Sequence, residues 1–495
     1  MRRILKGLCK LALCATAAIV LPAQIAFTTI YSFHGTYGEL PNTSLVQTTN
    51  GYLYGTTLNG GANGCGSVFR ITPSGNPEDT QYSFCEHESY TDGRNPMGAL
   101  FQAANGALYG TTFGGIPNQG PYGLSGTIFK VTLAGELTTL YYFCSEPNCP
   151  DGYNPQAGLV QAGNGDLYGT TGAGGNGANC FDSGCGTIFK ITSSGTLTTL
   201  YSFCAQLECA DGYSPNAGLI QARNGDLYGT TEYGGLNSIG PPRGLGTAFK
   251  ITPSGKLTTL YIFCTKGGCS DGAYPRGDLV QATDGNLYGT TAGGGSGAGT
   301  VFRLTPSGTL TTLYTFCAQS SCPDGKFPSG GLVQATDGIL YGTTLDGGAN
   351  GGGTVFKITL GGKLTTLYSF CAEAGCSDGT NPNSGLIQDT NGDLYGITAN
   401  GGASGQGTVY RVSVGLRWFV KMQTTSGRVG AAIKILGANL TGTTGVSFNG
   451  TDAEYKVDSS SEITATVPVG ATTGQIQVIT PEHTLESHVP FIVRP

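Results

Sequence analysis

A short phrase, Leu-Tyr-Gly, returns seven times along this chain and constrains the fold more than any other feature of the sequence. Its tyrosines stand 55, 59, 60, 60, 53 and 54 residues apart: Tyr54, Tyr109, Tyr168, Tyr228, Tyr288, Tyr341 and Tyr395. A period of this length is typical of a repeat architecture, in which each unit buries its apolar face only against its neighbours. We number the units repeat 1 to repeat 7 by these tyrosines and expect them to form one body.

Each repeat reads as four short antiparallel strands, as repeat 3 illustrates. An apolar stretch at 158–162 is followed by Asn164-Gly165, a pair that accepts positive φ and favours a tight hairpin. The stretches 167–171, 186–192 and 197–203 follow, rich in β-branched and aromatic residues and without helical periodicity. Four such strands per unit are typical of a β-propeller blade.

The two ends of the repeat region predict a closed ring. Residues 26–33 read as a fourth strand that no first three precede, and residues 407–411 read as a third strand that no fourth follows. Pairing the two segments would complete the last blade and remove both sheet edges. A linear solenoid, the alternative, has no use for such a half-unit. For residues 27–411 we therefore predict an all-β fold, a seven-bladed β-propeller of four-stranded blades closed by the N-terminal strand.

The N-terminus is typical of a secretory signal. Basic residues among the first six precede an apolar stretch at 11–21, which is too short to span a membrane, and small residues for cleavage follow. We predict a signal peptide at residues 1–23, with cleavage as late as residue 26. The expected location is secreted or cell-surface, extracellular or periplasmic, with no membrane span after signal cleavage. A net charge of −6 provides no basic surface, so nucleic acid is not an expected partner.

The cysteines indicate disulfides formed in an oxidising compartment. Of 16 cysteines, fourteen remain once Cys9 and Cys14 leave with the signal, and twelve of these form C-x4-C pairs. The pairs are Cys144/Cys149, Cys180/Cys185, Cys204/Cys209, Cys264/Cys269, Cys317/Cys322 and Cys371/Cys376, and Cys65 and Cys85 flank one hairpin and can meet across it. Zinc is the rival interpretation, but the spacing does not suit paired zinc knuckles. The sequence leaves open how Cys180, Cys185, Cys204 and Cys209 pair.

In such blades the connections alternate between two faces. The turns after the first and third strands are tight and uniform, whereas the strand 2–3 loops and the links between repeats are longer and share the other face, called the loop face below. Binding residues concentrate in variable loops of this kind. The longest strand 2–3 loops, 113–125, 172–185 and 232–245, carry the residues that we predict to bind a ligand: Phe113, Tyr122, Phe181, Asp182, Glu232, Tyr233 and Arg243. Loop packing is the alternative role for these side chains.

Two sets of polar residues recur, and each has a structural and a ligand-binding interpretation. The links between repeats read Cys-x4-Cys-x-Asp-Gly-x-x-Pro, as in 144–155 and 317–328. The aspartates of the links precede Gly and Pro, which favours turn stabilisation over calcium binding; they are Asp92, Asp151, Asp211, Asp271, Asp324 and Asp378. A glutamine ends each first strand, where it is expected to satisfy backbone groups at the blade edge rather than to grip a polar ligand; these are Gln47, Gln102, Gln161, Gln221, Gln281, Gln334 and Gln388.

No catalytic pattern accompanies the repeats. The four histidines show no metal-binding spacing, and neither a nucleophile elbow nor a phosphate-binding loop is present. We therefore predict no catalytic residue, no metal and no cofactor, and a secreted or cell-surface scaffold whose loop face contacts a glycan or a protein partner. The alternative is a propeller-fold polysaccharide lyase or glycoside hydrolase, for which Glu232 with Asp182 or Asp346 would supply two carboxylates.

After residue 411 the repeats stop. Residues 412–424, which include the only tryptophan, Trp418, predict a linker that packs against the propeller. Residues 425–495 read as short alternating strands at sandwich spacing. Their segments "ILGANLTG" and "FNG" closely resemble an IPT/TIG domain, an immunoglobulin-like module. The resemblance implies a spacer or interaction domain without catalytic residues.

The repeats themselves resemble the bacterial GloVer-type (Gloeo/Verruco) tandem repeats, whose hallmark is the run seen here as "GLVQATDGILYGTT…GGGTVFKIT". The resemblance covers residues 27–411 and implies an exported protein with no settled activity. Members often carry a sorting anchor, whereas this chain ends after the TIG-like segment, so we expect a freely secreted or loosely attached protein. The ligand, the anchoring mode and the oligomeric state stay open.

Overall fold

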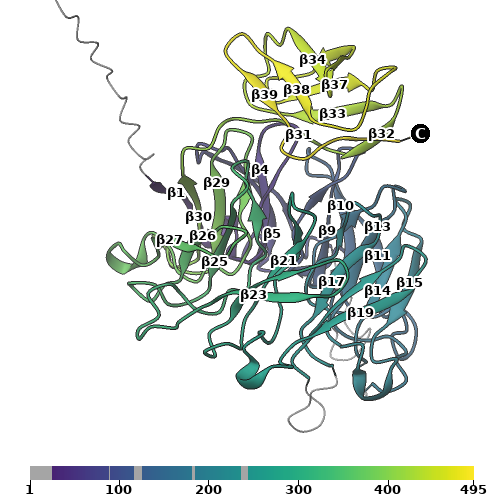
Figure 1. Ribbon diagram of the computed structural model, residues 1–495, viewed down its shortest axis with the longest axis vertical. Coiled ribbons are helices and arrows are strands. Elements are labelled where there is room, and N and C mark those ends of the chain that lie inside the picture. Colours follow the sequence, from purple (N-terminus) through teal and green to yellow (C-terminus); the bar gives the residue numbers. More distant parts are fainter. Residues whose placement is uncertain (1–24, 88–89, 116–124, 181–183, 236–243, 495) are drawn as a thin grey trace, which may run out of the picture.

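The computed structural model describes residues 25–87, 90–115, 125–180, 184–235 and 244–494 (Figure 1). The predicted signal peptide, residues 1–23, lies outside them. The protein is all-β, and the helices within its described residues are single 3-10 turns, among them η1 (Gly35–Tyr37), η4 (Leu207–Cys209), η5 (Gly267–Cys269) and η6 (Ala374–Cys376). No helix within the described ranges is long and apolar enough to cross a membrane.

Repeat 3 shows how one unit folds. Its antiparallel sheet has the order β12 (Val160–Gln161), β13 (Leu167–Thr171), β14 (Thr187–Ile191) and β15 (Leu197–Ser202). The last three strands fall where the sequence predicts them, but the first is two residues long instead of five. Residues 158–159 do not pair with β13, and the Thr170 hydroxyl on that strand donates to the Ala217 carbonyl of the next repeat at 3.3 Å.

The other repeats form sheets of the same antiparallel order. In repeats 1 and 2 an additional short strand pairs with the second strand. The strands are β2 (Glu39–Pro41), β3 (Val46–Gln47), β4 (Leu53–Asn59), β5 (Ser67–Ile71) and β6 (Pro77–Ser83); β7 (Arg94–Pro96), β8 (Phe101–Gln102), β9 (Leu108–Gly114), β10 (Thr127–Val131) and β11 (Leu137–Tyr142); β16 (Ile220–Gln221), β17 (Leu227–Thr231), β18 (Thr247–Ile251) and β19 (Leu257–Ile262); β20 (Val280–Gln281), β21 (Leu287–Thr291), β22 (Thr300–Leu304) and β23 (Leu310–Thr315); β24 (Val333–Gln334), β25 (Leu340–Thr344), β26 (Thr354–Ile358) and β27 (Leu364–Ser369); and β28 (Ile387–Gln388), β29 (Leu394–Thr398) and β30 (Thr408–Ser413).

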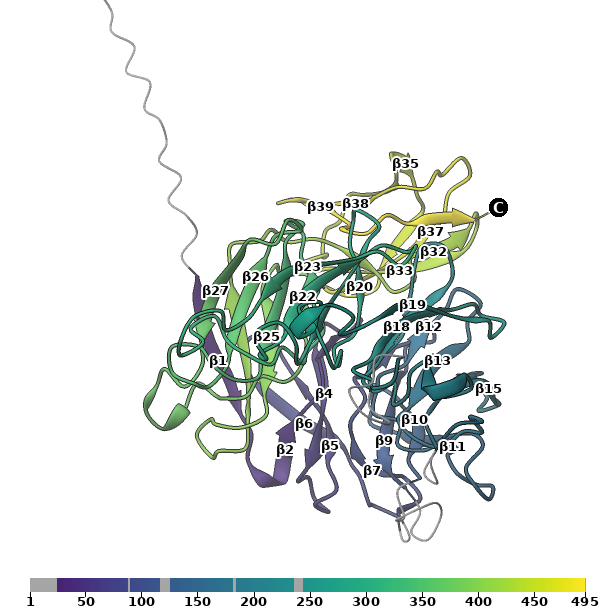
Figure 2. The same ribbon diagram turned by 60° about the horizontal axis from the view of Figure 1, so that its bottom comes forward.

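The N-terminal strand joins the last repeat. Strand β1 (Ala26–Ser32) pairs antiparallel with β30, with Ala26 opposite Ser413 and Ser32 opposite Thr408. The resulting sheet has the order β1-β30-β29-β28, which is the four-stranded order of repeats 3 to 6. In Figure 2 the purple β1 accordingly lies among the green strands of the last repeats. The arrangement of the repeats is therefore propeller-like.

The recurring Leu-Tyr-Gly phrase fills the space between sheets. All seven of its tyrosines are at most 1% exposed. The glycine is required by the next strand: a Cβ on Gly342 would lie 2.7 Å from the Phe356 ring and 2.7 Å from Leu332. The ring of Phe356 in turn packs with Tyr288 and Phe316 of the preceding repeat. Each apolar cluster thus combines residues of two neighbouring repeats, because no four-stranded sheet can bury both its faces alone.

The recurring glutamines tie successive sheets together. Each side-chain oxygen accepts a backbone N–H from the preceding repeat at 2.8–3.2 Å. Gln47 of repeat 1 accepts from Thr390 of repeat 7. Six of the side-chain amides also donate to a turn carbonyl four residues on. The structural interpretation of these glutamines is confirmed: they satisfy backbone groups at the sheet edges.

Residues 421–494 form a second body with its own core. One sheet has the order β31 (Lys421–Met422), β33 (Ala432–Leu436), β37 (Glu462–Thr466) and β36 (Tyr455–Val457). Another has the order β35 (Thr451–Asp452), β34 (Gly445–Phe448), β38 (Ile476–Ile479) and β39 (Thr484–Glu486), and β32 (Ser426–Arg428) pairs in parallel with β40 (Ile492–Arg494). Ile435, Phe448 and Val478 lie in the shared apolar core. Strand β31 begins within the segment predicted as a linker.

This tail body lies on the face of the strand 1–2 turns, opposite the loop face (Figure 1). The backbone N–H of Phe419 donates to Thr390, and the Ser461 hydroxyl donates to the Thr49 carbonyl at 2.8 Å. The predicted linker therefore does contact the repeats. The Trp418 ring packs against the core of the tail body and lies 5.3 Å from the ring of His483.

Candidate functional site

The links on the loop face are held by a repeated polar contact. In each link the Asp carboxylate accepts a hydrogen bond from a strand-4 tyrosine hydroxyl at 2.8–2.9 Å and another from a backbone N–H six or seven residues earlier. Burial, with the hydrogen bond to Asp324, raises the pKa of Tyr314 to about 12. The aspartates therefore fix the turns, as the sequence predicts.

Seven disulfides reinforce this face, and they join the cysteines that the sequence predicts to be bonded. Where the sequence leaves the pairing open, the structure has Cys180 bonded to Cys185 and Cys204 to Cys209. Each C-x4-C bond closes a short loop, for which loop entropy alone gives about 2 kcal/mol of stabilisation. The seven bonds are Cys65–Cys85, Cys144–Cys149, Cys180–Cys185, Cys204–Cys209, Cys264–Cys269, Cys317–Cys322 and Cys371–Cys376.

The links share one sequence pattern, but their backbone conformation differs at two of these cysteines, Cys149 and Cys322. Both are disulfide-bonded as predicted, but neither ends a 3-10 turn in the described links. Each is followed by a proline, Pro150 or Pro323, which has no N–H to continue the turn. At Cys149 and Cys322 the link is therefore an ordinary turn, and the sequence pattern and the predicted disulfides hold at both. In the other links the second cysteine ends η4, η5 or η6: Cys209, Cys269 and Cys376.

One charged cluster breaks the repeat on the loop face. Glu232 directly follows β17 and is 5% exposed. Its Oε1 accepts hydrogen bonds from Nε and Nη2 of Arg276 at 2.9 and 2.7 Å, and its Oε2 accepts from the Asn216 side chain at 2.7 Å. Burial alone would lower the pKa of Arg276, but the bonds from Glu232 raise it. A buried carboxylate thus holds a half-exposed guanidinium in one orientation.

Three tyrosine rings pack together beside this pair, and the central one, Tyr233, directly follows Glu232. Tyr233 stacks on Tyr213 with ring centroids 5.4 Å apart and an interplanar angle of 21°, and Tyr274 meets Tyr233 edge-on at 5.8 Å. The backbones of Tyr213 and Tyr233 exchange hydrogen bonds at 2.9 and 3.2 Å, which fixes the stack. Burial, followed by a hydrogen bond to Glu232, raises the pKa of Tyr233. The rings and the ion pair therefore form one cluster, which is called the Arg276 cluster below.

The backbone at Tyr274 takes a left-handed conformation that recurs at this link position in every repeat, where the other residues are Leu40, Asn95, Asn154, Ser214, Phe327 and Asn381. Its φ is +56°, in the left-handed region that favours Gly or Asn. Repeats 2, 3 and 7 place asparagines there, Asn95, Asn154 and Asn381. A bulky side chain in this region costs on the order of 1 kcal/mol, which the surrounding structure must offset.

The structure assembles only part of the predicted ligand-binding set. Glu232 and Tyr233 come together, but Glu232 is buried and paired rather than exposed on a loop. Phe113 lies within β9, two repeats away, because that strand extends through Gly114. Four members of the set, Tyr122, Phe181, Asp182 and Arg243, lie outside the described residues.

Sequence reasoning missed Asn216, Arg276, Tyr213 and Tyr274. A signal for Arg276 was available in the residue that follows the link proline in each repeat. Those residues are Asn42, Met97, Gln156, Asn216, Arg276, Ser329 and Asn383, and Arg276 alone is charged. The tyrosines gave no such signal, since aromatic residues are common throughout these repeats.

The contacts of Glu232 hold it as a hydrogen-bond acceptor. Both oxygens of Glu232 are engaged by donors, one of them a guanidinium, so this carboxylate is held as an acceptor. Asp346, its proposed catalytic partner, lies instead 3.7 Å from the ammonium of Lys326. These contacts therefore do not form the pair of carboxylates, Glu232 and Asp346, that a glycosidase would need.

Comparisons with known proteins give a family. A family model described as the Gloeobacter/Verrucomicrobia repeat matches residues 18–146, 76–268 and 238–460. No curated protein matches the chain.

Solved structures give distant likenesses. The chain is similar to selenomethionine-substituted virginiamycin B lyase from Staphylococcus aureus, with 17% identity, a TM-score of 0.41, and 78% of this chain and 98% of that chain covered. It is also similar to the extracellular domain of a protein assigned as a hybrid two-component system from B. thetaiotaomicron, with 14% identity, a TM-score of 0.48, and coverages of 96% and 60%. A luciferin-regenerating enzyme shows 13% identity, a TM-score of 0.40, and coverages of 66% and 93%. At these identities and TM-scores, none of the three transfers a ligand or an activity to this chain.

Proposed function

The chain belongs to the Gloeobacter/Verrucomicrobia repeat family, and from that premise we propose that it is a secreted or cell-surface glycan-binding scaffold whose ligand binds at the Arg276 cluster. One observation carries the proposal: three packed tyrosine rings lie beside a guanidinium that a buried carboxylate holds in place, and Tyr233 links the rings to that ion pair. The location is supported by the seven disulfides, which are typical of oxidising compartments.

The proposed architecture is a seven-bladed β-propeller closed by β1, followed by an IPT/TIG-like sandwich. The ring is supported by the β1–β30 pairing and by the glutamine hydrogen bonds, which lead from each repeat to the next and from repeat 7 back to Gln47. The sandwich is supported by the two four-stranded sheets that share a core. Covering the strand 1–2 turns with the tail leaves the loop face open to a partner.

A glycan fits the chemistry of the cluster better than a protein does. Tyrosine faces offer flat apolar surface for the C–H side of a sugar ring, and their hydroxyls supply polar contacts at the edge. Arg276 and Asn216 provide N–H donors for ring hydroxyls. Glu232 neutralises Arg276, so the cluster offers no net charge to a charged polysaccharide. A neutral glycan is therefore the proposed ligand.

The proposal is tested by a glycan array with the intact protein, followed by calorimetry on any hit. Tyr274→Ala should weaken binding at least about tenfold, as expected for a stacking ring that contributes over 1 kcal/mol. Phe327→Ala is the matched control, since Phe327 holds the same link position in repeat 6 with φ +58°. Absence of any glycan hit, or equal affinity loss in both variants, would refute the site. Capture of a protein instead of a glycan would replace the ligand class.

A further inference from the structure

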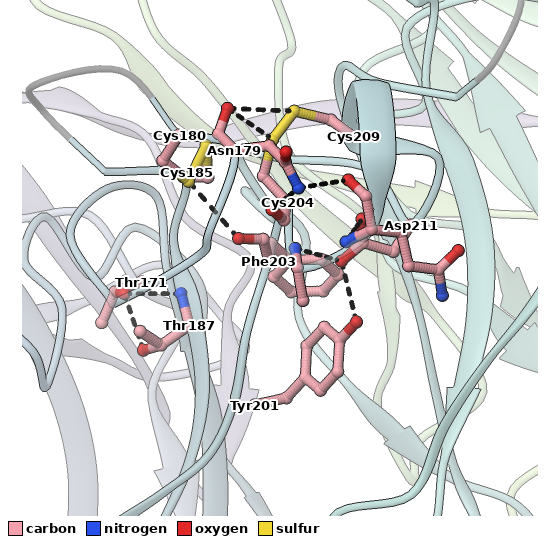
Figure 3. Close-up of a disulfide and its surroundings, with 12 residues drawn as sticks. Thr171, Asn179, Cys180, Cys185, Thr187, Tyr201, Phe203, Cys204, Cys209 and Asp211 are labelled. Atoms are coloured by element: carbon pink, nitrogen blue, oxygen red, sulfur yellow. Dashed lines mark hydrogen bonds between the residues drawn. A yellow bond between two sulfur atoms is a disulfide. The ribbon is translucent and has the colours of Figure 1, made fainter.

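Two disulfides meet on the loop face of repeat 3. Cys180–Cys185 closes the strand 2–3 loop, and Cys204–Cys209 closes the link to repeat 4. The Sγ atoms of Cys180, Cys185 and Cys204 all lie within 4.8 Å of one another (Figure 3). The carbonyl oxygen of Asn179 lies 3.4 Å from Sγ of Cys204 and 4.0 Å from Sγ of Cys209. Four sulfurs are thus gathered at one place.

Repeat 1 shows that a different pairing is possible at the same positions. Cys65 precedes Gly-Ser-Val-Phe as Cys185 precedes Gly-Thr-Ile-Phe, and Cys85 ends a Tyr-Ser-Phe-Cys run as Cys204 does. In repeat 1 these two positions are bonded to each other, with a Cα–Cα distance of 5.9 Å. Repeat 1 has Tyr90 at the position of the second link cysteine, so its Cys85 has no local competitor.

The backbone around the two pairs also matches. The Cys65 carbonyl accepts from the Asn95 N–H at 2.8 Å, and the Cys185 carbonyl accepts from the Ser214 N–H at 2.9 Å. Asn95 and Ser214 occupy the same left-handed position of their links, with φ of +54° in both. Repeat 3 therefore holds Cys185 and Cys204 in the backbone arrangement in which Cys65 and Cys85 form a disulfide in repeat 1. In repeat 3, however, each of these two cysteines is bonded to another cysteine.

We propose that these four cysteines form a thiol–disulfide exchange site with two pairings: Cys180–Cys185 with Cys204–Cys209, and Cys185–Cys204 with Cys180–Cys209. A small thiol is the reactant that interconverts them. Cys180 is the half-buried member, whereas Cys185, Cys204 and Cys209 are at most 5% exposed, so the thiol enters at Cys180.

Each step exchanges one sulfur–sulfur bond for another. An external thiolate attacks Sγ of Cys180 and expels the Cys185 thiolate. This thiolate attacks Sγ of Cys204, forming Cys185–Cys204 and expelling the Cys209 thiolate. The Cys209 thiolate attacks Sγ of Cys180 in the mixed disulfide, forming Cys180–Cys209 and releasing the external thiolate. No electrons are gained or lost overall, so a trace of thiol is enough.

Trypsin distinguishes the two pairings. Cleavage after Lys190 and Arg223 places Cys180 and Cys185 in peptide 131–190, and Cys204 and Cys209 in peptide 191–223. The pairing of the structure leaves these peptides separate, whereas the exchanged pairing cross-links them. The full-length protein is incubated with substoichiometric glutathione, blocked with N-ethylmaleimide, digested without reduction and analysed by mass spectrometry. We expect the cross-linked pair to rise at least about tenfold over a sample without glutathione.

The Cys264–Cys269 bond is the internal control, because repeat 4 has no second disulfide beside it; its two cysteines should stay linked only to each other. No cross-link, or equal scrambling of this control, would overturn the proposal.

Two variants test the exchange without added thiol. In Cys180→Ser we expect Cys185 to capture Cys204 and leave Cys209 alkylated. Cys209→Ser copies repeat 1, and we expect Cys204 to capture Cys185 and leave Cys180 alkylated. If Cys185 is the sole alkylated thiol in the first variant and Cys204 in the second, the proposal fails.

Discussion

Removing the guanidinium from the Arg276 cluster should destabilise the protein measurably. Arg276→Met keeps most of the side-chain volume but deletes two hydrogen bonds to Glu232, at 2.9 and 2.7 Å, and its counter-charge. Breaking a fully buried pair costs about 3–5 kcal/mol. Here the Arg276 side chain is 50% exposed, so water can partly replace it, whereas that of Glu232 is only 7% exposed. We therefore expect a loss of about 2 kcal/mol in the free energy of unfolding.

A double-mutant cycle checks the cause of this loss. In Arg276→Met with Glu232→Gln no buried charge is left, so the double variant should be more stable than the sum of the single losses predicts, by about 1–2 kcal/mol. Thermal unfolding and urea unfolding at pH 7 supply the values. Lys326→Met is the control, since the Lys326–Asp346 pair is over a third exposed on both sides and should contribute under about 1 kcal/mol.

The sign of the pH dependence follows from the same contact. In Arg276→Met the buried Glu232 carboxylate lacks its cation, and an unpaired buried charge is costly unless protonation removes it. The variant should then gain stability relative to the wild type as the pH falls from 7 towards 4. This account of the cluster would be refuted if Arg276→Met changed the free energy of unfolding by less than about 0.5 kcal/mol. Additive losses in the double variant, or a stability difference from the wild type that does not change with pH, would also refute it.

Three further predictions concern the stability of the repeats. Gly342→Ala should lower the free energy of unfolding by about 2 kcal/mol or more, because its Cβ would lie 2.7 Å from a buried phenylalanine ring. Gly361→Ala should be neutral by thermal unfolding, since the one neighbour of its Cβ would be Oγ1 of Thr359 at 3.9 Å. Asp378→Ala should cost about 3 kcal/mol in urea unfolding, since it leaves the Tyr368 hydroxyl and two backbone N–H groups without their acceptor, and Asp378→Asn should cost less. Burial raises the pKa of Asp389 to about 6, so the stability that this group contributes is full below about pH 4 and is lost as the pH rises through 6. Asp389→Asn should remove that component from the melting temperature measured between pH 4 and 8. These expectations would be contradicted if Gly361→Ala lost as much stability as Gly342→Ala, or if Asp378→Ala were as stable as the wild type. An unchanged pH profile of the melting temperature in Asp389→Asn would contradict the third.

Much of the architecture of the repeats was predictable from the sequence. The strands of each repeat follow from runs of β-branched and aromatic residues between Asn-Gly and Ser-Gly turns, and these are local signals. The turn role of the link aspartates and the edge role of the glutamines were also predictable, because the same residue at the same place in every repeat points to a contact that every repeat needs.

The candidate site was predictable only in part. Glu232 and Tyr233 stand out because they break the repeat, but their partners Asn216 and Arg276 lie 16 and 44 residues from Glu232. Neighbouring repeats bring these side chains together only when their sheets stack, so no local pattern announces the contact. The same holds for Cys185 and Cys204, which are remote from each other in sequence and whose sulfurs become neighbours on the loop face.

The sequence by itself determined the period, the strands, the turns and the glycines that the period requires, because these depend on interactions within one unit or with an identical neighbour. The tertiary structure alone decided what differs between units: which tyrosines meet, which carboxylate holds which guanidinium, and which face the tail covers. The physical reason is that contacts shared by the repeats involve residues that recur along the sequence and can be recognised there. A contact between two unlike side chains on adjacent units occurs only once, and it can be identified only from their positions in the folded structure.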